Sequence, residues 1–439
     1  MIADSVDLDR FDAIVLGAGI SGLVATSILL QQGAQNVLVV DEYSHCGGNH
    51  IDCQIGDYTF DVGSYIFQDD SPLLAHFPEL LPLYVPINPS WGRLTPYGIV
   101  THYPISIRDD LFLAGPVEWF RILSSVLLAR LIPRQMANAR DFATFWIGAR
   151  LFDRSGLEHY VDRFYGVPAE KVDIKFAEKR MLWIKEHATL RNLVRKLMSP
   201  PKPPTNRQLA RPREGFAYLY QRAMERLERQ GAKFLLGTKL DRIRKEDDRF
   251  AIVAGNREVA CRRLVSTIPL TSTQRLCGIA AEDDLHTVTL ISLFFSFSGI
   301  RGFDQSILYN FSNQGAWKRL TVHSDFYGRC RGREFFAVEV NADGVGGDVA
   351  EAERDFREHV ARNGLFAGDL HLEGSHTLEN AYPIYTKNAD ERARKAIAEL
   401  RAFGIESIGR QGGFDYQPTA RDSTVKAEAA LRSGNYSAQ

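Results

Sequence analysis

Residues 11–42 read FDAIVLGAGISGLVATSILLQQGAQNVLVVDE, and the fold class can be inferred from them. An apolar strand pattern leads into the turn GAGISG at 17–22, a helix pattern follows, and a second strand pattern ends at Asp41. Such a βαβ unit binds dinucleotides, because its glycines let the backbone approach a pyrophosphate and the helix N-terminus offers unpaired N–H groups to the anion. The carboxylate of Asp41 stands where it can accept a hydrogen bond from a ribose hydroxyl.

A second glycine pair follows shortly after Asp41, in Gly47-Gly48-Asn49. Taken alone it is compatible with a plain loop. In this position it indicates a second close approach of backbone to ligand, which an extended FAD needs and a nicotinamide dinucleotide does not. We therefore predict FAD. The cofactor-binding residues predicted in this part of the chain are Gly17, Gly19, Ser21, Gly22, Asp41, Gly47, Gly48 and Asn49.

The bulk composition excludes several classes of protein. The 439 residues exceed what one hydrophobic core fills, so we expect about two or three domains. A net charge of −1 argues against nucleic-acid binding. The 5 cysteines are scattered without CxxC spacing, which predicts neither a disulfide framework nor a metal site and fits a reducing cytoplasm. With no signal-peptide pattern and no apolar run long enough to span a bilayer, we expect a cytoplasmic protein without an integral membrane segment.

The first βαβ unit is not followed by others, and the next glycine turn of this kind comes only at 409–426. We therefore predict an α/β protein whose Rossmann-like FAD-binding domain is assembled from discontinuous segments, with a helical domain and an antiparallel β-sheet substrate domain. The predicted segments are 1–80, 210–270 and 404–439 for the FAD-binding domain, 116–209 for a mostly helical substrate or lid domain, and 81–115 with 271–403 for the β-rich substrate domain.

The order of these motifs resembles the FAD group that includes protoporphyrinogen oxidase-like and amine oxidase-like flavoproteins. In that group GxGxxG, an acidic residue, GGN and a D-x-G turn, here Asp61-Val62-Gly63, follow one another. The stretches 212–215 and 265–270 are also similar. Within the group, the chain resembles the UDP-galactopyranose mutase family. The matching segments are WKRLTVH at 317–323, AYPI at 381–384, GRQG at 409–412 and Tyr416.

The resemblance implies roles for individual residues. Arg319 would lie near the flavin and the substrate diphosphate, Tyr382 and Tyr416 would contact the diphosphate, and Arg410 would meet the FAD pyrophosphate. Tyr65 stands where the family has a histidine beside the flavin. The residues assigned through the resemblance are Arg319, Tyr382 and Tyr416 as catalytic, Gly63, Arg410 and Asp422 as cofactor-binding, and Tyr160 (over the base), Tyr165 (for a family tryptophan), Tyr65 and Arg180 as substrate-binding.

The function that the resemblance implies is an FAD-dependent sugar-nucleotide mutase. It would contract the pyranose ring of a nucleoside-diphosphate sugar to a furanose, with N5 of the reduced flavin as nucleophile and NADPH or NADH as reductant. A guanidinium and two phenols suit a leaving diphosphate, because they are fixed hydrogen-bond donors. The alternative is an amine oxidase-like or protoporphyrinogen oxidase-like oxidoreductase that acts on a small organic substrate. A flavin-loaded binding protein is a third option.

Two further stretches have open interpretations. The basic segment from Lys179 to Arg213 is either a lid that closes on a diphosphate or a solvated helix face and loop. The apolar stripe Trp119, Phe120, Leu123, Val126 and Leu127 has helical spacing, which favours core packing or the contact of a homodimer over a membrane anchor.

Overall fold

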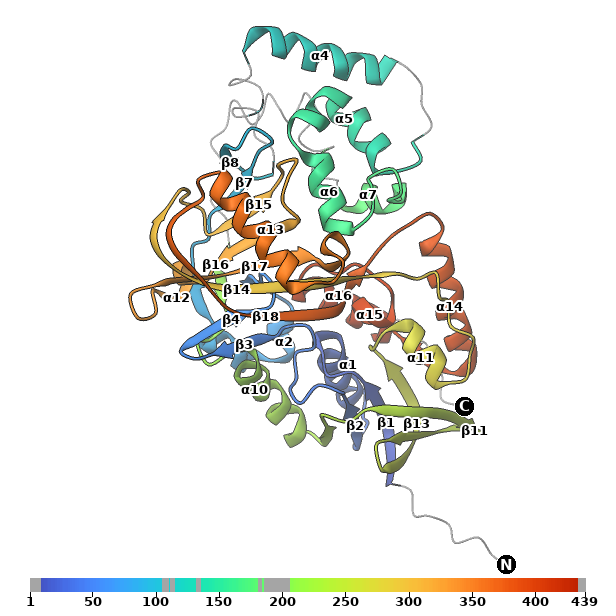
Figure 1. The fold of residues 1–439 in the computed structure, drawn as a ribbon. Coiled ribbons are helices and arrows are strands. Elements are labelled where there is room, and N and C mark those ends of the chain that lie inside the picture. The colour runs from blue at the N-terminus through green and yellow to red at the C-terminus, as the bar shows by residue number, and fades with distance from the viewer. Residues whose placement is uncertain are drawn as a thin grey trace, which may run out of the picture.

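The computed structural model describes residues 9–104, 110, 115–131, 136–180, 184 and 206–432. Figure 1 shows three layers along the long axis of the molecule: a Rossmann-like sheet at one end, a second large sheet in the middle, and a group of helices at the other end. The predicted fold class is confirmed by this arrangement.

The first seven-stranded sheet is built from distant parts of the chain, in the order β10-β2-β1-β13-β12-β11 with β19 paired to β13. Strands β10, β2, β1, β13 and β19 run parallel, whereas β12 and β11 are antiparallel additions. The strands are β1 (Asp9–Leu16), β2 (Val37–Val40), β10 (Ala232–Leu235), β11 (Leu240–Glu246), β12 (Arg249–Ala254), β13 (Arg257–Ser266) and β19 (Ile405–Ser407).

Both faces of this sheet are covered, which is why β1 is apolar at consecutive positions. Ala13 and Val15 join one apolar cluster with α1, α10 and α16, whereas Ile14 and Leu16 join another with α11 and α14. A short helical turn, α15, follows β19. These helices are α1 (Ile20–Gln31), α10 (Phe216–Arg229), α11 (Leu270–Leu276), α14 (Ala389–Phe403), α15 (Gly409–Gly412) and α16 (Ala420–Arg432).

The second seven-stranded sheet has the order β18-β14-β17-β16-β15-β7-β8, antiparallel except where β15 pairs with β7. Helix α13 packs its Phe356 against one face, together with Val338 and Val340 of β17. The bounds are β7 (Trp91–Leu94), β8 (Val100–His102), β14 (Thr287–Arg301), β15 (Ile307–Asn310), β16 (Trp317–Val322), β17 (Glu334–Asn341), α13 (Val349–Arg362) and β18 (Phe366–Pro383).

Short elements fill the space between the two sheets. The hairpin of β3 and β4 contacts β17 and β18, and the small sheet β5-β9-β6 joins segments on either side of the helical region. These elements are β3 (Asp52–Ile55), β4 (Tyr58–Asp61), β5 (Phe67–Gln68), α2 (Leu73–His76), η1 (Pro78–Leu83), β6 (Val85–Ile87), β9 (Gln208–Ala210), α12 (Ser324–Tyr327) and η3 (Ala342–Val345).

The helical region forms the third layer. Helix α5 is bent at Gly148, where a side chain would lie 2.9 Å from the backbone nitrogen of Val126 in α4. In the described part of the chain, no helix is both long and apolar enough to span a bilayer. The helices are α4 (Pro116–Leu131), α5 (Ala139–Arg154), α6 (Leu157–Tyr165) and α7 (Ile174–Arg180).

The structure corrects one expectation for this region. The spacing of the apolar stripe in α4 favours core packing or the contact of a homodimer. Core packing is contradicted, because Phe120 is 75% exposed, and Leu123 and Leu127 are exposed as well. The residues that α4 buries are instead Glu118 and Ile122. The apolar stripe therefore faces outward.

Candidate cofactor and substrate site

A cavity of about 540 Å³ lies at the carboxyl end of the parallel strands, where β1 meets α1. This edge of a Rossmann sheet is where dinucleotides bind. Eight residues predicted to bind the cofactor line the cavity: Gly17, Gly19, Ser21, Asp41, Gly47, Gly48, Asn49 and Arg410.

Two glycines show why the cavity needs a bare backbone. A Cβ on Gly22 would lie 1.9 Å from the carbonyl oxygen of Gly17, so only glycine lets α1 pack against the turn. Gly48 has φ +60, and a Cβ there would lie 2.9 Å from Cα of Gly19. The two glycine turns thus lie against each other and form one cradle. This geometry fits a ligand whose pyrophosphate approaches the backbone closely.

The carboxylate of Asp41 is bound to the backbone of the first turn. It accepts hydrogen bonds from the N–H of Ala18 at 2.5 Å and from that of Tyr43 at 2.8 Å. Burial raises the pKa of Asp41, and these two hydrogen bonds oppose the shift. Glu42, beside it, also lines the cavity and was missed by the sequence argument. Asp41 therefore fixes the glycine turn to the end of β2.

Arg410 brings a cation to the same cavity from α15. Its guanidinium donates to the carbonyl of Gln417 at 2.7 Å and to that of Ala381 at 3.2 Å. Both acceptors are neutral carbonyl groups, so the positive charge is available to an anion. Two other predicted cofactor residues do not line this cavity. A Cβ added at Gly63 would lie 3.0 Å from the Tyr65 ring, and Asp422 accepts from the hydroxyl of Thr419 at 2.6 Å at the start of α16.

A histidine, His50, lies beside Tyr65. Tyr65 itself stands at the position where the resembled family has a histidine. The imidazole of His50 is 4.7 Å from the Tyr65 ring between centroids, and its Nδ1 is 2.5 Å from the hydroxyl of Tyr220. Tyr65 donates its own hydroxyl to the carbonyl of Asn49. Burial, with a smaller contribution from Arg410, lowers the pKa of His50 to about 3, so its ring is neutral. Sequence reasoning missed His50, although it directly follows Gly47-Gly48-Asn49.

The second sheet contributes a buried charge cluster. Trp317 of β16 stands opposite Val340 and Arg319 stands opposite Glu339, so Lys318 is an extra residue in a β-bulge. Nζ of Lys318 lies 3.0 Å from Oε2 of Glu339, and Nε of Arg319 donates to Oε1 at 2.6 Å. Two cations therefore share one carboxylate. The cluster Lys318-Glu339-Arg319 carries a surplus positive charge when Lys318 is protonated.

Burial and charge act in opposite directions within this cluster. Burial lowers the pKa of Lys318 to about 8, although Glu339 favours the protonated form. Burial also opposes ionisation of Glu339, but Arg319 and Lys318 together hold its pKa below the usual value. Glu339 likewise keeps the pKa of Arg319 above its ordinary range against the effect of burial. Lys318 is thus the titratable member of the cluster near neutral pH.

Of the two predicted catalytic tyrosines, Tyr382 lies against this cluster and Tyr416 lies against Tyr382. The hydroxyl of Tyr382 accepts from Nζ of Lys318 at 3.1 Å and donates to the carbonyl of Phe164 at 2.6 Å. The rings of Tyr382 and Tyr416 meet edge to face with centroids 5.8 Å apart. The structure therefore brings Arg319, Tyr382 and Tyr416 together through Lys318 and Glu339, neither of which was predicted.

Two of the three predicted substrate-binding aromatics, Tyr160 and Tyr165, lie on α6. Tyr160 stacks on Phe311 with centroids 4.4 Å apart, and Tyr165 is buried edge to face against Phe164 and Phe176. The side chain of Arg180 lies outside the described residues, as does most of the basic segment from Lys179 to Arg213.

Arg211 contradicts the lid interpretation for its part of that basic segment. It is 1% exposed and forms an ion pair with Asp61 of the D-x-G turn. Arg211 therefore belongs to the core beneath the site.

Comparison with known proteins agrees with this geometry. Residues 15–79 match the NAD(P)-binding Rossmann-like domain, and residues 170–347 match the flavin-containing amine oxidoreductases. The crystal structure of reduced UDP-galactopyranose mutase superposes with a TM-score of 0.78 at 18% identity, over 96% of this chain and 94% of that one. The fold is that of UDP-galactopyranose mutase. A protein from Exiguobacterium sp. 255-15, provisionally assigned to the protoporphyrinogen oxidases, superposes with a TM-score of 0.73 at 17% identity over 97% of this chain.

Sequence relatives match over short stretches. The chain is 45% identical over 60 residues to prolycopene isomerase 2 of an Oncidium hybrid cultivar, covering 14% of this chain and 10% of that protein. It is 37% identical over 75 residues to UDP-galactopyranose mutase of Mycoplasma pneumoniae, covering 16% of this chain and 18% of the relative. The matches thus span less than a fifth of these relatives' own length. Together the comparisons support a flavin-dependent enzyme.

Proposed function

We propose that this protein is an FAD-dependent mutase that contracts the pyranose ring of a nucleoside-diphosphate sugar to a furanose. One observation carries the proposal. Lys318 and Arg319 share the single carboxylate of Glu339 and lie beside Tyr382 and Tyr416. A surplus cation held by buried partners and flanked by phenols suits a diphosphate that must leave and return.

The energetic argument concerns the charge that develops on the diphosphate as its bond to the sugar breaks. A positively charged group that is already fixed in a low-dielectric site needs no reorganisation when that charge appears. Arg319 is fixed because two of its nitrogens bind Oε1 of Glu339. Donors positioned in this way each contribute roughly 3 kcal/mol to the stabilisation of a developing anion.

Lys318 and the tyrosines have separate tasks in this proposal. The phenolic proton of Tyr382 is already donated to the carbonyl of Phe164, so Tyr382 orients Lys318 rather than donating to a phosphate. Tyr416 lies edge to face against Tyr382 and forms part of the same wall. We propose that the cationic groups of Lys318 and Arg319 bind the diphosphate and that Tyr160 and Tyr165 line the path to the base and the sugar.

The cofactor proposed for this reaction is FAD. The cradle of Gly17, Gly19, Gly47 and Gly48 and the guanidinium of Arg410 would hold its pyrophosphate. When bound in its reduced form, the flavin supplies a nucleophilic nitrogen for the anomeric carbon, and NADPH or NADH is the proposed reductant. The chain's own contribution is to position the sugar and to stabilise the departing diphosphate.

A second candidate is an FAD-dependent oxidoreductase for a small organic substrate. It is favoured by the match of residues 170–347 to the flavin-containing amine oxidoreductases and by Tyr65, which replaces the histidine of the resembled mutases. This function would need no diphosphate site, so it leaves the surplus charge of Lys318 and Arg319 unexplained.

Product analysis separates the two candidates. The protein is reduced with dithionite and offered a panel of UDP-, GDP- and TDP-sugars, and the ring size of the product is read by NMR. The mutase predicts furanose product without a stoichiometric oxidant. The oxidoreductase instead predicts that an amine or another small substrate bleaches the oxidised flavin, while every nucleotide sugar is recovered unchanged.

A further inference from the structure

Tyr309 of β15 lies directly opposite Arg319 in the pairing of β15 with β16. Residues opposite each other in an antiparallel pair have side chains on the same face of the sheet, with Cβ atoms only about 5 Å apart. The guanidinium carbon of Arg319 is 5.9 Å from the centroid of the Tyr309 ring, which is within the range of a cation–π contact. Arg319 therefore has a partner on each neighbouring strand, Glu339 on β17 and Tyr309 on β15.

The hydroxyl of Tyr309 is the polar part of this contact. Burial raises the pKa of the phenol, whereas the charge of Arg319 and its hydrogen bond to the phenol act in the opposite direction. A guanidinium can only donate, so the oxygen of Tyr309 accepts this hydrogen bond. Tyr309 thus contacts Arg319 through its hydroxyl as well as through its ring.

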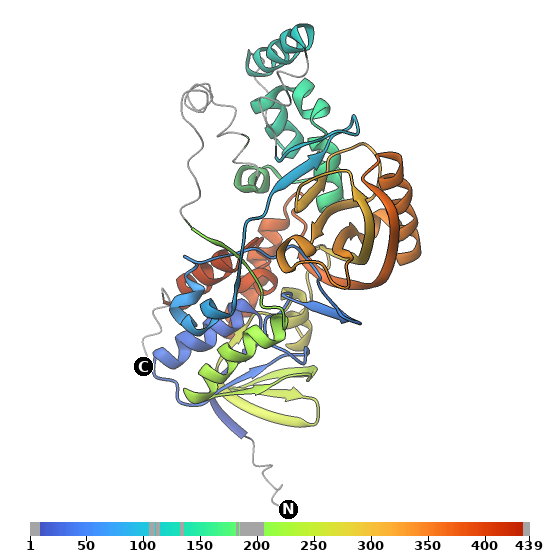
Figure 2. The ribbon, with the colours of Figure 1, turned by 90° about the vertical axis from the view of Figure 1, so that its left-hand side faces the viewer.

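Two other tyrosines hold the ring of Tyr309 in place. It stacks on Tyr103, which directly follows β8, with centroids 4.0 Å apart and an interplanar angle of 15°. Tyr160 of α6 meets it edge to face with centroids 5.7 Å apart. In both views the edge of the second sheet formed by β7 and β8 lies next to the helical layer that contains α6 (Figures 1 and 2). Only 9% of Tyr309 is exposed, which leaves little of its surface for direct contact with a substrate.

The contact with Glu339 alone leaves Arg319 one degree of freedom. Nε and one terminal nitrogen of Arg319 both bind the same oxygen, Oε1 of Glu339. A group bound at a single acceptor atom can still pivot about that atom. The second contact, to Tyr309 on the other neighbouring strand, removes this pivot.

We propose that Tyr309 is a positioning residue that holds the guanidinium of Arg319 in the direction required to bind a diphosphate. A planar guanidinium binds phosphate oxygens well only when its N–H groups point at them. This role depends on the proposed function, because it requires Arg319 to bind the diphosphate of the substrate.

The test is titration calorimetry of the FAD-loaded protein with UDP and with inorganic pyrophosphate. Tyr309→Phe keeps the stacked ring and removes only the hydroxyl, so it should weaken the binding of both ligands by the same factor, about threefold to tenfold. Arg319→Ala should bind more weakly but still measurably, because Lys318 remains. In that background Tyr309→Phe should have no further effect, since the two residues act through one contact and their effects are not additive.

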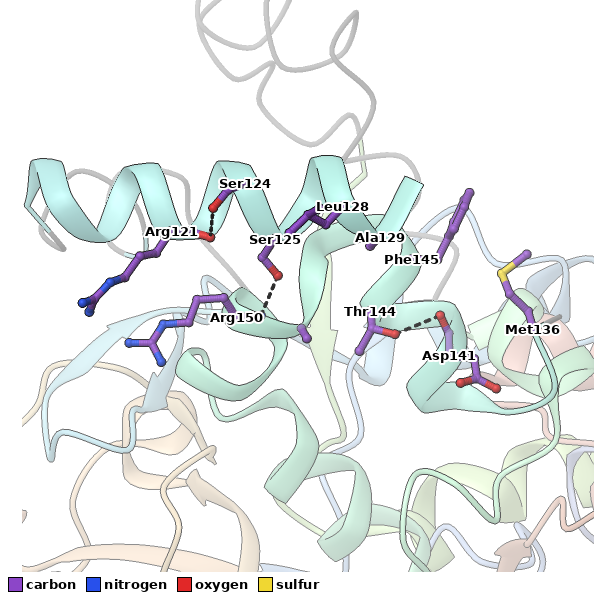
Figure 3. Close-up of a pocket in the computed structure, with 11 residues that line it drawn as sticks. Arg121, Ser124, Ser125, Leu128, Ala129, Met136, Asp141, Thr144, Phe145 and Arg150 are labelled. Carbon is purple, nitrogen blue, oxygen red and sulfur yellow. Dashed lines mark hydrogen bonds between the residues drawn. The ribbon is translucent and has the colours of Figure 1, made fainter. Parts of the chain in front are cut away.

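Two other hydroxyl deletions are the matched controls. Tyr327 is also buried, but its hydroxyl donates to the carbonyl of Arg211 at 3.2 Å. Thr144 belongs to the helical layer, where its hydroxyl donates to the carbonyl of Asp141 at 3.2 Å beside a cavity of about 570 Å³ between α4 and α5 (Figure 3). Tyr327→Phe and Thr144→Val should leave both affinities unchanged. Retention of FAD and the thermal midpoint verify that each variant is folded.

The role of Tyr309 is overturned if Tyr309→Phe binds both ligands as tightly as the wild type, or if its loss of affinity persists in full in the Arg319→Ala background. It is also overturned if only the binding of UDP weakens, because Tyr309 would then act on the nucleoside. If the wild type itself bound neither ligand, the diphosphate site would be wrong, and the proposed function would fall together with the role of Tyr309.

Discussion

Lys318 and Arg319 are consecutive residues of β16, yet both side chains reach the carboxylate of Glu339. In a regular strand, successive side chains point to opposite faces of the sheet. The β-bulge between Trp317 and Arg319 removes that alternation and gives two cations one partner. We therefore treat Lys318, Arg319 and Glu339 as one functional unit.

Replacing Arg319 by Ala should lower turnover of the nucleotide sugar about 100-fold or more, because a fixed donor to the developing anion is lost. FAD should stay bound to this variant, since Arg319 does not line the cavity formed by the glycine turns. Arg263→Ala is a suitable control. Arg263 pairs with Glu406 far from the cluster, so this variant should turn over the nucleotide sugar at the wild-type rate. Full turnover of Arg319→Ala would remove Arg319 from the mechanism.

The affinity for UDP should fall as the pH rises through about 8, where Lys318 loses its proton. The sign follows from the lowered pKa: the ammonium is present below about 8, and above it the cluster is neutral overall. Titration calorimetry between neutral and alkaline pH measures the effect. Lys318→Met should bind UDP more weakly at neutral pH and should not show the step. A step that persists in Lys318→Met would assign the titration to another group.

Gly48→Ala should weaken FAD binding about tenfold or more, because the new Cβ would lie 2.9 Å from Cα of Gly19 and separate the two turns. Gly56→Ala provides the control for backbone strain. Gly56 has nearly the same conformation, φ +58 against φ +60, but has no atom within 4 Å of the added Cβ. Fluorescence titration of the apoprotein with FAD measures both. Equal affinities in the two variants would show that the close approach of the two turns is unimportant.

His323→Leu should keep or raise the free energy of unfolding, by up to about 1 kcal/mol, because it removes buried polar atoms that lack a hydrogen bond. Both ring nitrogens of His323 have no hydrogen-bond partner among the described residues, and the carboxylate of Asp61 is 4.0 Å away. Burial, with Arg211 next, lowers the pKa of His323 to about 3.

The matched comparison for His323 is His76→Leu. His76 is also buried, but its nitrogens contact Ser27 at 2.9 Å and Glu428 at 3.1 Å. Its loss should lower the free energy of unfolding by about 1–3 kcal/mol, since the partners are left without it. Urea denaturation followed by circular dichroism gives both values. If His323→Leu destabilised the protein as much as His76→Leu, the imidazole of His323 would have a hydrogen-bond partner of its own.

The nucleotide end of the molecule could be predicted from the amino-acid sequence. In residues 11–42 the strand, the turn and the helix are specified by neighbouring positions: Gly22 must be glycine because its Cβ would meet Gly17 five residues before it. Motif order also indicated the discontinuous sheet, in which β19 returns to β13. Local spacing is sufficient in residues 11–42 because each contact lies within one supersecondary unit. The discontinuous sheet follows instead from the order of motifs shared with the resembled flavoproteins.

The tertiary structure alone decided the charge cluster, the histidine beside Tyr65 and the direction of α4. The register of β16 depends on its pairing with β17, so no pattern in 317–323 shows that Lys318 joins Arg319 at Glu339. His50 meets Tyr65 only because two turns fold against α10. The helical spacing of Phe120 and Leu127 predicts one apolar face. Which face α4 buries depends on α5, because Arg150 of that helix forms an ion pair with the buried Glu118.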